Sequence, residues 1–328
     1  MKKSLVALAA LTLVGAASAQ VTITGTLSFS NQQSLDRTRG IAVTDNSFNF
    51  GITEDLGGGL KLTAKTGFDA GGRNTAFTGA AGMEDFRLGV SGGFGALNMA
   101  SYESDGPFAN VAISGASLPV GPFDANGANM GKRARNAITY VSPNFSGFTG
   151  ALTYVTPAGT YAPEDTLDAN NKVVPALTYA AGPLKAYVEV AMFNQSYNNN
   201  ADDRVTHPTA YVSYDFGVAK VAAGWTKPSN RGATVGLGLN VPLGALTLGA
   251  ETFSYNNVQP GNIGAGTYSD IAISYALSKR TSIKTSFGTV NDAFIAYSTA
   301  NAFGQTNLAT SATGSTNNQT RVGIFHSF

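Results

Sequence analysis

Apolar and polar residues alternate along short segments that recur through most of the chain. In the first clear segment, Val21 to Ser30, every even position is Thr or Ser, and Val, Ile, Leu and Phe occupy all but one of the odd positions. A period of two places one kind of side chain on each face of a β-strand. Similar segments recur to the end of the sequence, and their count predicts sixteen strands. The predicted fold class is therefore all-β.

The connections between these strands alternate in length. Seven are short and contain Gly, Pro, Asp or Ser, the residues that favour tight turns. The short connections are Asp55–Gly59, Gly92–Gly95, Pro143–Gly147, Ala181–Pro183, Asp215–Gly217, Pro242–Gly244 and Ser278–Arg280. Eight are mostly long and polar, among them Asn31–Asn46, Glu103–Lys132, Thr156–Lys172 and Val290–Asn318. An antiparallel membrane barrel with an even number of strands has short turns at its periplasmic rim and longer loops at its outer rim.

Charged residues within the predicted strands all fall on the polar face. They are Lys61, Lys65, Asp85, Arg87, Arg133, Arg135, Lys185, Glu189, Lys220, Glu251, Asp270, Lys284 and Arg321. A charged residue facing lipid at the bilayer midplane costs roughly 2–4 kcal/mol for Lys or Arg, so lipid contact favours this segregation. Sixteen strands also enclose an aqueous lumen, which an eight-stranded barrel fills with side chains. The pattern predicts a 16-stranded antiparallel transmembrane barrel, with a secreted, water-soluble β-protein as the alternative.

The first residues have the pattern of an export signal. Met1–Lys3 is positively charged, Ser4–Ala16 is apolar, and Ala17–Ala19 is a small-residue cleavage site. The apolar run is shorter than the ~20 residues that a membrane-spanning helix needs. We therefore expect a cleaved signal peptide at residues 1–19 and a barrel domain at residues 20–328.

Composition argues against several other classes of function. The formal net charge is +1, so the chain lacks the basic field that binds nucleic acid, and it has no cysteine for disulfides or thiolate chemistry. His207 and His326 are predicted at opposite rims of the barrel, too far apart for one catalytic site. We therefore predict no enzyme activity, no metal and no cofactor. The acidic residues of the loops, Glu164, Asp165, Asp168, Asp202 and Asp203, are interpreted as solvated charges rather than calcium ligands.

Four blocks of sequence carry a family resemblance. They are Asn136–Phe148, Glu54–Leu60, Tyr275–Thr281 and Val322–Phe328. Together they resemble the trimeric general porins of β-proteobacterial outer membranes, in the same order along the chain. The resemblance implies a homotrimeric channel in the cell outer membrane, in contact with lipid and lipopolysaccharide. It also implies that Val322, Ile324, His326 and Phe328 form the signal read by the outer-membrane assembly machinery.

The same resemblance implies that the third outer loop, residues 103–132, folds into the lumen as a constriction. Its acidic residues are Glu103, Asp105 and Asp124, and the facing wall cations are predicted to be Lys65, Arg87, Arg133 and Arg135. A field between loop acids and wall bases would orient water and disfavour apolar solutes. Ser47 and Gly51 occupy places where members of the family often carry Arg or Lys, which weakens the expected field.

The function implied is passive diffusion of small hydrophilic solutes and ions. Nine of the thirteen predicted wall charges are positive and four are negative, which favours a weak preference for anions. Two alternatives remain at this stage: a channel that prefers one substrate, and, more distantly, a structural or adhesive barrel that does not conduct.

Overall fold

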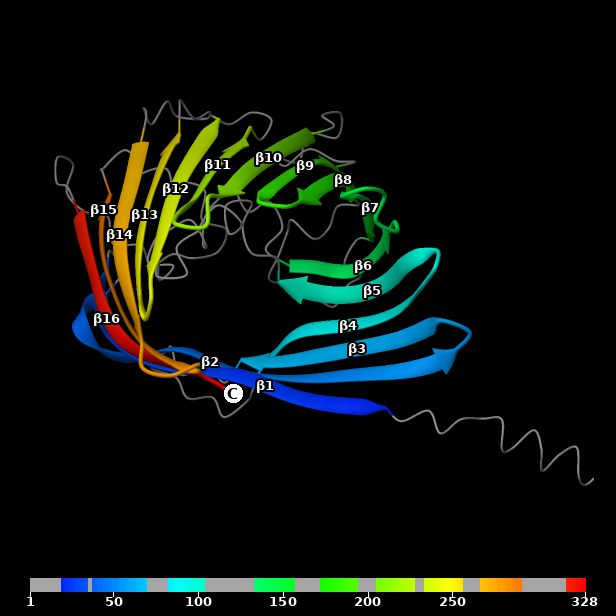
Figure 1. Ribbon diagram of the computed structural model, residues 1–328, viewed down its shortest axis with the longest axis horizontal. Coiled ribbons are helices and arrows are strands. Elements are labelled where there is room, and N and C mark those ends of the chain that lie inside the picture. The colour runs from blue at the N-terminus through cyan, green and yellow to red at the C-terminus, as the bar shows by residue number, and fades with distance from the viewer. Residues whose placement is uncertain are drawn as a thin grey trace, which may run out of the picture.

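Sixteen β-strands form a closed barrel in the computed structural model (Figure 1). The structure describes residues 19–34, 37–69, 82–103, 133–156, 172–193, 205–227, 233–255, 266–290 and 317–328. The strands are β1 (Gln20–Ser34), β2 (Arg37–Gly57), β3 (Leu60–Asp69), β4 (Gly82–Gly92), β5 (Gly95–Glu103), β6 (Arg133–Val141), β7 (Phe148–Val155), β8 (Lys172–Ala181), β9 (Leu184–Phe193), β10 (Val205–Asp215), β11 (Lys220–Thr226), β12 (Thr234–Leu243), β13 (Leu246–Tyr255), β14 (Gly266–Ala276), β15 (Thr281–Val290) and β16 (Asn317–Ser327). The predicted fold class and strand number are confirmed.

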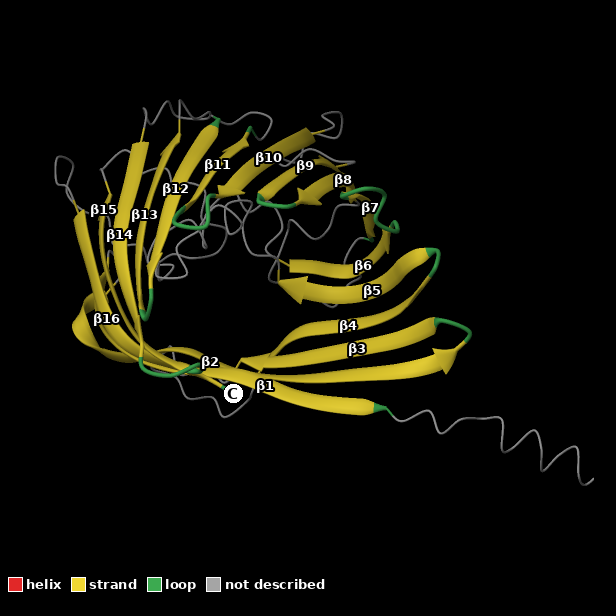
Figure 2. Cartoon of the chain, in the orientation of Figure 1, coloured by secondary structure: helices red, strands yellow, loops and turns green. Residues whose placement is uncertain are grey.

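Each strand pairs antiparallel with its neighbours in the sequence, and β1 pairs with β16 to close the sheet. Closure leaves no sheet edge unpaired, so strands satisfy their backbone hydrogen bonds within the barrel, as a hydrocarbon environment requires. Figure 2 shows strands joined by short loops, with no helix in the described part of the chain. Accordingly, none of the described residues belongs to a helix that could cross a membrane.

The short turns are stabilised by polar side chains that accept hydrogen bonds from the backbone. The Oδ1 atom of Asp55 accepts from the amide of Gly57 at 2.9 Å, and Oδ1 of Asp215 accepts from Gly217 at 2.8 Å. Gly57 and Gly217 have φ angles of 81° and 80°, which glycine adopts without the steric cost that a Cβ atom imposes. The seven connections predicted to be short all lie between consecutive strands.

The two faces of the barrel wall differ in chemistry as the alternation predicts. On β12, Val235, Leu237 and Leu239 are exposed, whereas Thr234 on the opposite face is buried. On β14, Ile271 is 62% exposed and its neighbour Asp270 is 3% exposed. The polar residues therefore face the lumen, and the exposed apolar residues form the outer surface that faces lipid.

At the seam between β1 and β16, the backbones of Gly25 and Phe328 exchange two hydrogen bonds of 3.1 Å. The ring of Phe328 lies over Gly25, and its centroid is 5.4 Å from that of Phe48 on β2. A Cβ atom at residue 25 would collide with this ring and with the carbonyl oxygen of Ser47. Glycine is therefore required at residue 25 for this approach.

Several predicted connections overlap the ends of strands, and the connection between β1 and β2 differs most from the prediction. The expected loop Asn31–Asn46 is mostly strand, because β1 continues to Ser34 and β2 begins at Arg37. With 15 and 21 residues, these strands exceed the ~9–11 residues that cross a bilayer, so the hairpin extends beyond the membrane. The connection expected at Thr156–Lys172 is shorter, because Lys172 is the first residue of β8.

Candidate pore lining

The lumen face of β3 and β4 carries a cluster of charges that includes two of the predicted site residues. Lys65 and Arg87 are cross-strand partners, so their side chains leave the wall side by side. The ammonium of Lys65 lies 3.4 Å from Oδ2 of Asp85 in an ion pair. The Lys65 side chain is 44% exposed, so water screens this pair and its contribution to stability is small. Its main effect is on the charge that the lumen presents to ions.

Of three other predicted constriction residues, Glu103, Arg133 and Arg135, the structure describes the backbone alone. Glu103 and Arg133 are backbone partners at the ends of β5 and β6, and Arg135 lies two residues further along β6. The side chains of these three residues fall outside what the structure describes. Asp105 and Asp124 also lie outside the described residues, as do the loop acids considered as calcium ligands. The constriction loop of residues 103–132 therefore stays a prediction, as does the signal peptide at residues 1–19.

A second cationic cluster lies where β15 and β16 meet β1. The ammonium of Lys284 is 5.0 Å from the ring centroid of Phe325, and the guanidinium carbon of Arg321 is 5.8 Å from the same centroid. The Nε atom of Arg321 donates a hydrogen bond of 3.2 Å to Oγ of Ser30 on β1. This wall segment is positively charged, and the Arg321–Ser30 hydrogen bond links the two strands of the seam.

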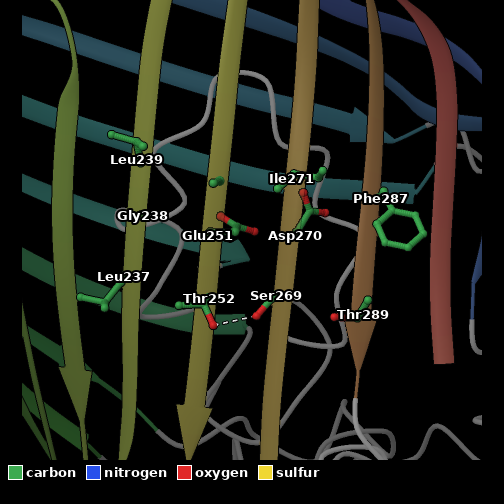
Figure 3. A pocket seen from close by; sticks show the side chains of 11 residues that line it. Leu237, Gly238, Leu239, Glu251, Thr252, Ser269, Asp270, Ile271, Phe287 and Thr289 are labelled. Carbon is green, nitrogen blue, oxygen red and sulfur yellow. Dashed lines mark hydrogen bonds between the residues drawn. The ribbon is translucent and has the colours of Figure 1, made fainter. Parts of the chain in front are cut away.

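An acidic segment lies on β13 and β14. Glu251 and Asp270 are cross-strand partners, and both side chains are buried, with exposed fractions of 9% and 3%. Figure 3 shows the two carboxylates side by side on neighbouring strands. Figure 1 places these strands across the barrel from β4 and β5. The wall therefore carries carboxylates on β13 and β14, opposite the Lys65–Arg87 cluster and next to the cations of β15 and β16.

Aromatic side chains also line the lumen. Tyr187 on β9 and Tyr211 on β10 are cross-strand partners whose rings stack with centroids 5.1 Å apart and an interplanar angle of 23°. The hydroxyl of Tyr187 donates a hydrogen bond of 2.5 Å to Oε2 of Glu189. Near the outer end of the wall, the ammonium of Lys172 lies 5.8 Å from the ring centroid of Phe193.

Sequence reasoning missed part of this lining. Lys172 was assigned to a loop, although alternation with Val174 and Ala176 would have extended β8 to include it. Glu251 and Asp270 were recognised as wall charges, but not as direct partners. A long connection joins their strands, and the sequence offers no tight turn from which their register could be read.

The two histidines do not form one site. His207 on β10 is buried on the lumen face, 4.9 Å from the Phe193 ring, whereas His326 is exposed on the outer face. The Nδ1 atom of His326 lies 2.9 Å from Oγ1 of Thr281 in a hydrogen bond between β16 and β15. Among the described residues, no group of three or more His, Asp or Glu side chains could hold a metal ion.

A closed barrel with a charged lumen and an apolar outer face defines a transmembrane β-barrel protein. Comparison with known proteins then gives the family. Residues 4–294 match the Gram-negative porin family, and the chain belongs to that family. It is thus an outer-membrane protein of a class whose barrels let solutes diffuse passively, and the predicted family resemblance is confirmed.

Two curated relatives and one solved structure illustrate the similarity. The chain is 30% identical over 250 residues to outer membrane porin protein 32 of Delftia acidovorans, covering 68% of each chain. It is 31% identical over 191 residues to the major outer membrane protein P.IB of Neisseria gonorrhoeae, covering 52% of this chain. That match spans 51% of the gonococcal protein, about half its length. The structure of an anion-selective porin from Comamonas acidovorans has a TM-score of 0.66 and 20% identity, covering 95% of this chain and all of that one.

Proposed function

We propose that this chain forms a water-filled channel through which small hydrophilic solutes and ions diffuse passively across the outer membrane. The observation that carries the proposal is the polar, charged lumen enclosed by a lipid-facing wall. Diffusion of this kind needs neither an energy source nor a cofactor, and we propose no enzyme activity.

The charge arrangement supports a transverse field in the channel. Lys65 and Arg87 contribute positive charge on one side, and Glu251 and Asp270 contribute negative charge on another. Such a field favours dipolar and charged solutes over apolar ones, which would have to displace oriented water. We further propose that Glu103, Asp105 and Asp124 of the 103–132 segment add negative charge opposite Lys65, Arg87, Arg133 and Arg135.

We also propose a weak preference for anions. The excess of lysine and arginine on the wall supports it, and the Comamonas structure to which the fold is similar is described as anion-selective. A homotrimer is proposed from the family resemblance, with contact to lipid and lipopolysaccharide on the remaining outer surface. The terminal residues Val322, Ile324, His326 and Phe328 are proposed as the assembly signal, and the first three of these lie on the outer face of β16.

A second candidate function is a channel that prefers one class of solute. The stacked pair Tyr187–Tyr211, with the Glu189 carboxylate beside it, favours this alternative, because aromatic rings next to acidic groups can bind sugars or cations. Conductance block that saturates with one solute, and that Tyr187→Ala abolishes, would establish it.

Single-channel recording of the refolded protein in a planar bilayer tests the proposal. We expect large, ohmic conductance steps, grouped in threes if the protein is trimeric. A salt gradient on the same membrane then gives the ion preference from the reversal potential. A folded, heat-modifiable barrel that never conducts would contradict the channel function and favour a structural or adhesive role.

A further inference from the structure

The lumen face of β9 carries an aromatic ring between two opposite charges. Lys185, Tyr187 and Glu189 occupy alternate positions there; Lys185 is exposed, and the other two are half-buried. Their cross-strand partners on β10 are, in the same order, Ser213, Tyr211 and Thr209. The two hydroxyl residues of β10 are buried, with exposed fractions of 4% and 6%, so a solute in the lumen reaches the rings and the charged groups first. We call these six residues the tyrosine patch.

The stacking of Tyr187 on Tyr211 determines which ring face a solute can approach. The ring centroids are 5.1 Å apart and the interplanar angle is 23°, so Tyr187 covers the face of the Tyr211 ring that is turned towards β9. The opposite face is turned towards β11, where the cross-strand partner of Tyr211 is Gly224, which has no side chain. A flat solute that approaches Tyr211 from this side therefore meets no side chain from the partner position.

The Glu189 carboxylate lies next to the same rings. The hydroxyl of Tyr187 donates a hydrogen bond of 2.5 Å to Oε2 of Glu189. An ionised carboxylate has about four acceptor positions, so Glu189 can also accept hydrogen bonds from the hydroxyls of a solute, and the Lys185 ammonium can donate to them. The Cα atoms of Lys185 and Glu189 are four residues apart, ~14 Å along the strand. A disaccharide that hydrogen bonds at both ends covers this span.

The tyrosine patch lies away from the other charged parts of the wall. Along the sheet, β11 and β12 separate it from the carboxylates of β13 and β14, and β5 to β8 separate it from the Lys65–Arg87 cluster (Figure 1). On β11 its neighbour is the hydroxyl of Thr226, 3.1 Å from that of Thr209. An ion gains little net attraction at the patch, because one of its two charges attracts the ion and the other repels it. A neutral solute with several hydroxyls can hydrogen bond to both.

We propose that the tyrosine patch binds short neutral sugars with an apolar ring face, such as β-linked glucose disaccharides. The axial C–H groups of such a sugar form a face that leaves water when it stacks on Tyr211. Its equatorial hydroxyls donate to Glu189 and accept from Lys185, in hydrogen bonds strengthened by charge. The inference rests on the proposed channel and selects sugars over organic cations for its second candidate function.

Cellobiose is the probe, and its binding is measured in two ways. In planar bilayers, cellobiose should reduce the conductance of the refolded channel reversibly and with saturation. Sorbitol, which has hydroxyls but no ring, should reduce the conductance only in proportion to its concentration. Saturation-transfer NMR of cellobiose with the barrel in nanodiscs detects contact whether or not the barrel conducts. A barrel that binds cellobiose without conducting would contradict the channel alone, and a conducting barrel without saturable contact would contradict the sugar site alone.

Two variants remove the two kinds of contact. Tyr211→Ala deletes the stacking surface, and Glu189→Gln keeps the size of the side chain but removes its charge. Each should weaken cellobiose binding about fivefold or more. Tyr214→Ala, the same change on the outer face of β10, is the matched control and should bind cellobiose as wild type does. If Tyr211→Ala does not fold, Glu189→Gln decides the question.

Three results would overturn the sugar site. Equal reduction of the conductance by cellobiose and sorbitol would mean that no ring is recognised. Equal affinity for cellobiose in wild type, Tyr211→Ala and Glu189→Gln would place its binding elsewhere. Saturating block by choline at lower concentrations than cellobiose would assign the tyrosine patch to organic cations.

Discussion

Lys65 forms its ion pair with Asp85, and its cross-strand partner is Arg87, so two cations and one anion share a small area of the lumen wall. The carboxylate reduces the charge of this cluster from two to one. The cluster therefore contributes less to anion preference than its lysine and arginine alone suggest. Asp85 is consequently a residue through which selectivity can be raised without adding a positive charge.

Replacing Asp85 with asparagine should increase the anion preference. The change restores a full positive charge to the cluster at almost constant side-chain volume. At the dielectric constant of water, a unit charge about 8 Å away changes the energy of an ion by ~0.5 kcal/mol, so we expect a change of about twofold or more in the permeability ratio. The measurement is the reversal potential in a potassium chloride gradient. Asp215→Asn, the same change at a short turn outside the pore wall, is the matched control, and an equal shift in both variants would contradict the local explanation.

Substitution by arginine should destabilise the barrel at Leu177 on β8 but not at the adjacent residue Thr178. Leu177 is 44% exposed on the lipid face, and Thr178 lies next to it on the lumen face. Leu177→Arg should reduce folding stability by roughly 2–4 kcal/mol, since the charge enters hydrocarbon, whereas Thr178→Arg places it in the aqueous lumen. Urea titration of folding into lipid vesicles compares the two. Equal stabilities would mean that the faces are assigned wrongly.

The seam between β1 and β16 should be sensitive to any side chain at residue 25. Gly25→Ala introduces a methyl group beneath the Phe328 ring and against the Ser47 carbonyl, and overpacking of this kind costs ~1–3 kcal/mol. We expect the variant to lose its compact electrophoretic form at a lower temperature than wild type. At Gly93 an added Cβ atom would have no neighbour within 4 Å, so Gly93→Ala should leave that temperature unchanged.

Near the outer end of β10, the hydroxyl of Thr226 on β11 makes two contacts with residues of β10. Oγ1 of Thr226 donates to the carbonyl oxygen of Pro208 at 3.0 Å and lies 3.1 Å from Oγ1 of Thr209. Thr226→Val should cost about 1 kcal/mol or more, because it removes both contacts at a buried position. Thr209→Val removes the contact between hydroxyls and leaves the bond to Pro208. Chemical denaturation should therefore rank Thr226→Val as the less stable variant, and the reverse order would contradict this assignment.

Local sequence patterns predict most of the wall. Alternation in β1, β12 and β14 assigns their faces correctly, because lipid and water impose opposite demands on neighbouring residues. The turn at Asp55–Gly59 could also be predicted, because an aspartate followed by glycines favours a tight turn. The pairing of Glu251 with Asp270, in contrast, could not be predicted from local sequence. Register across a long connection depends on shear around the whole barrel, which no local pattern contains.

Fifteen of the sixteen strand pairings join neighbours along the chain, whereas the β1–β16 pairing brings Ser30 against Arg321. Until that last pairing forms, the sheet has two open edges whose amides and carbonyls can pair with any other extended chain. Contacts between residues so distant in sequence also form slowly, because closing a long loop costs entropy. The interval before closure is thus the stage at which aggregation competes with folding, and a helper that shields β1 or β16 would protect the chain most.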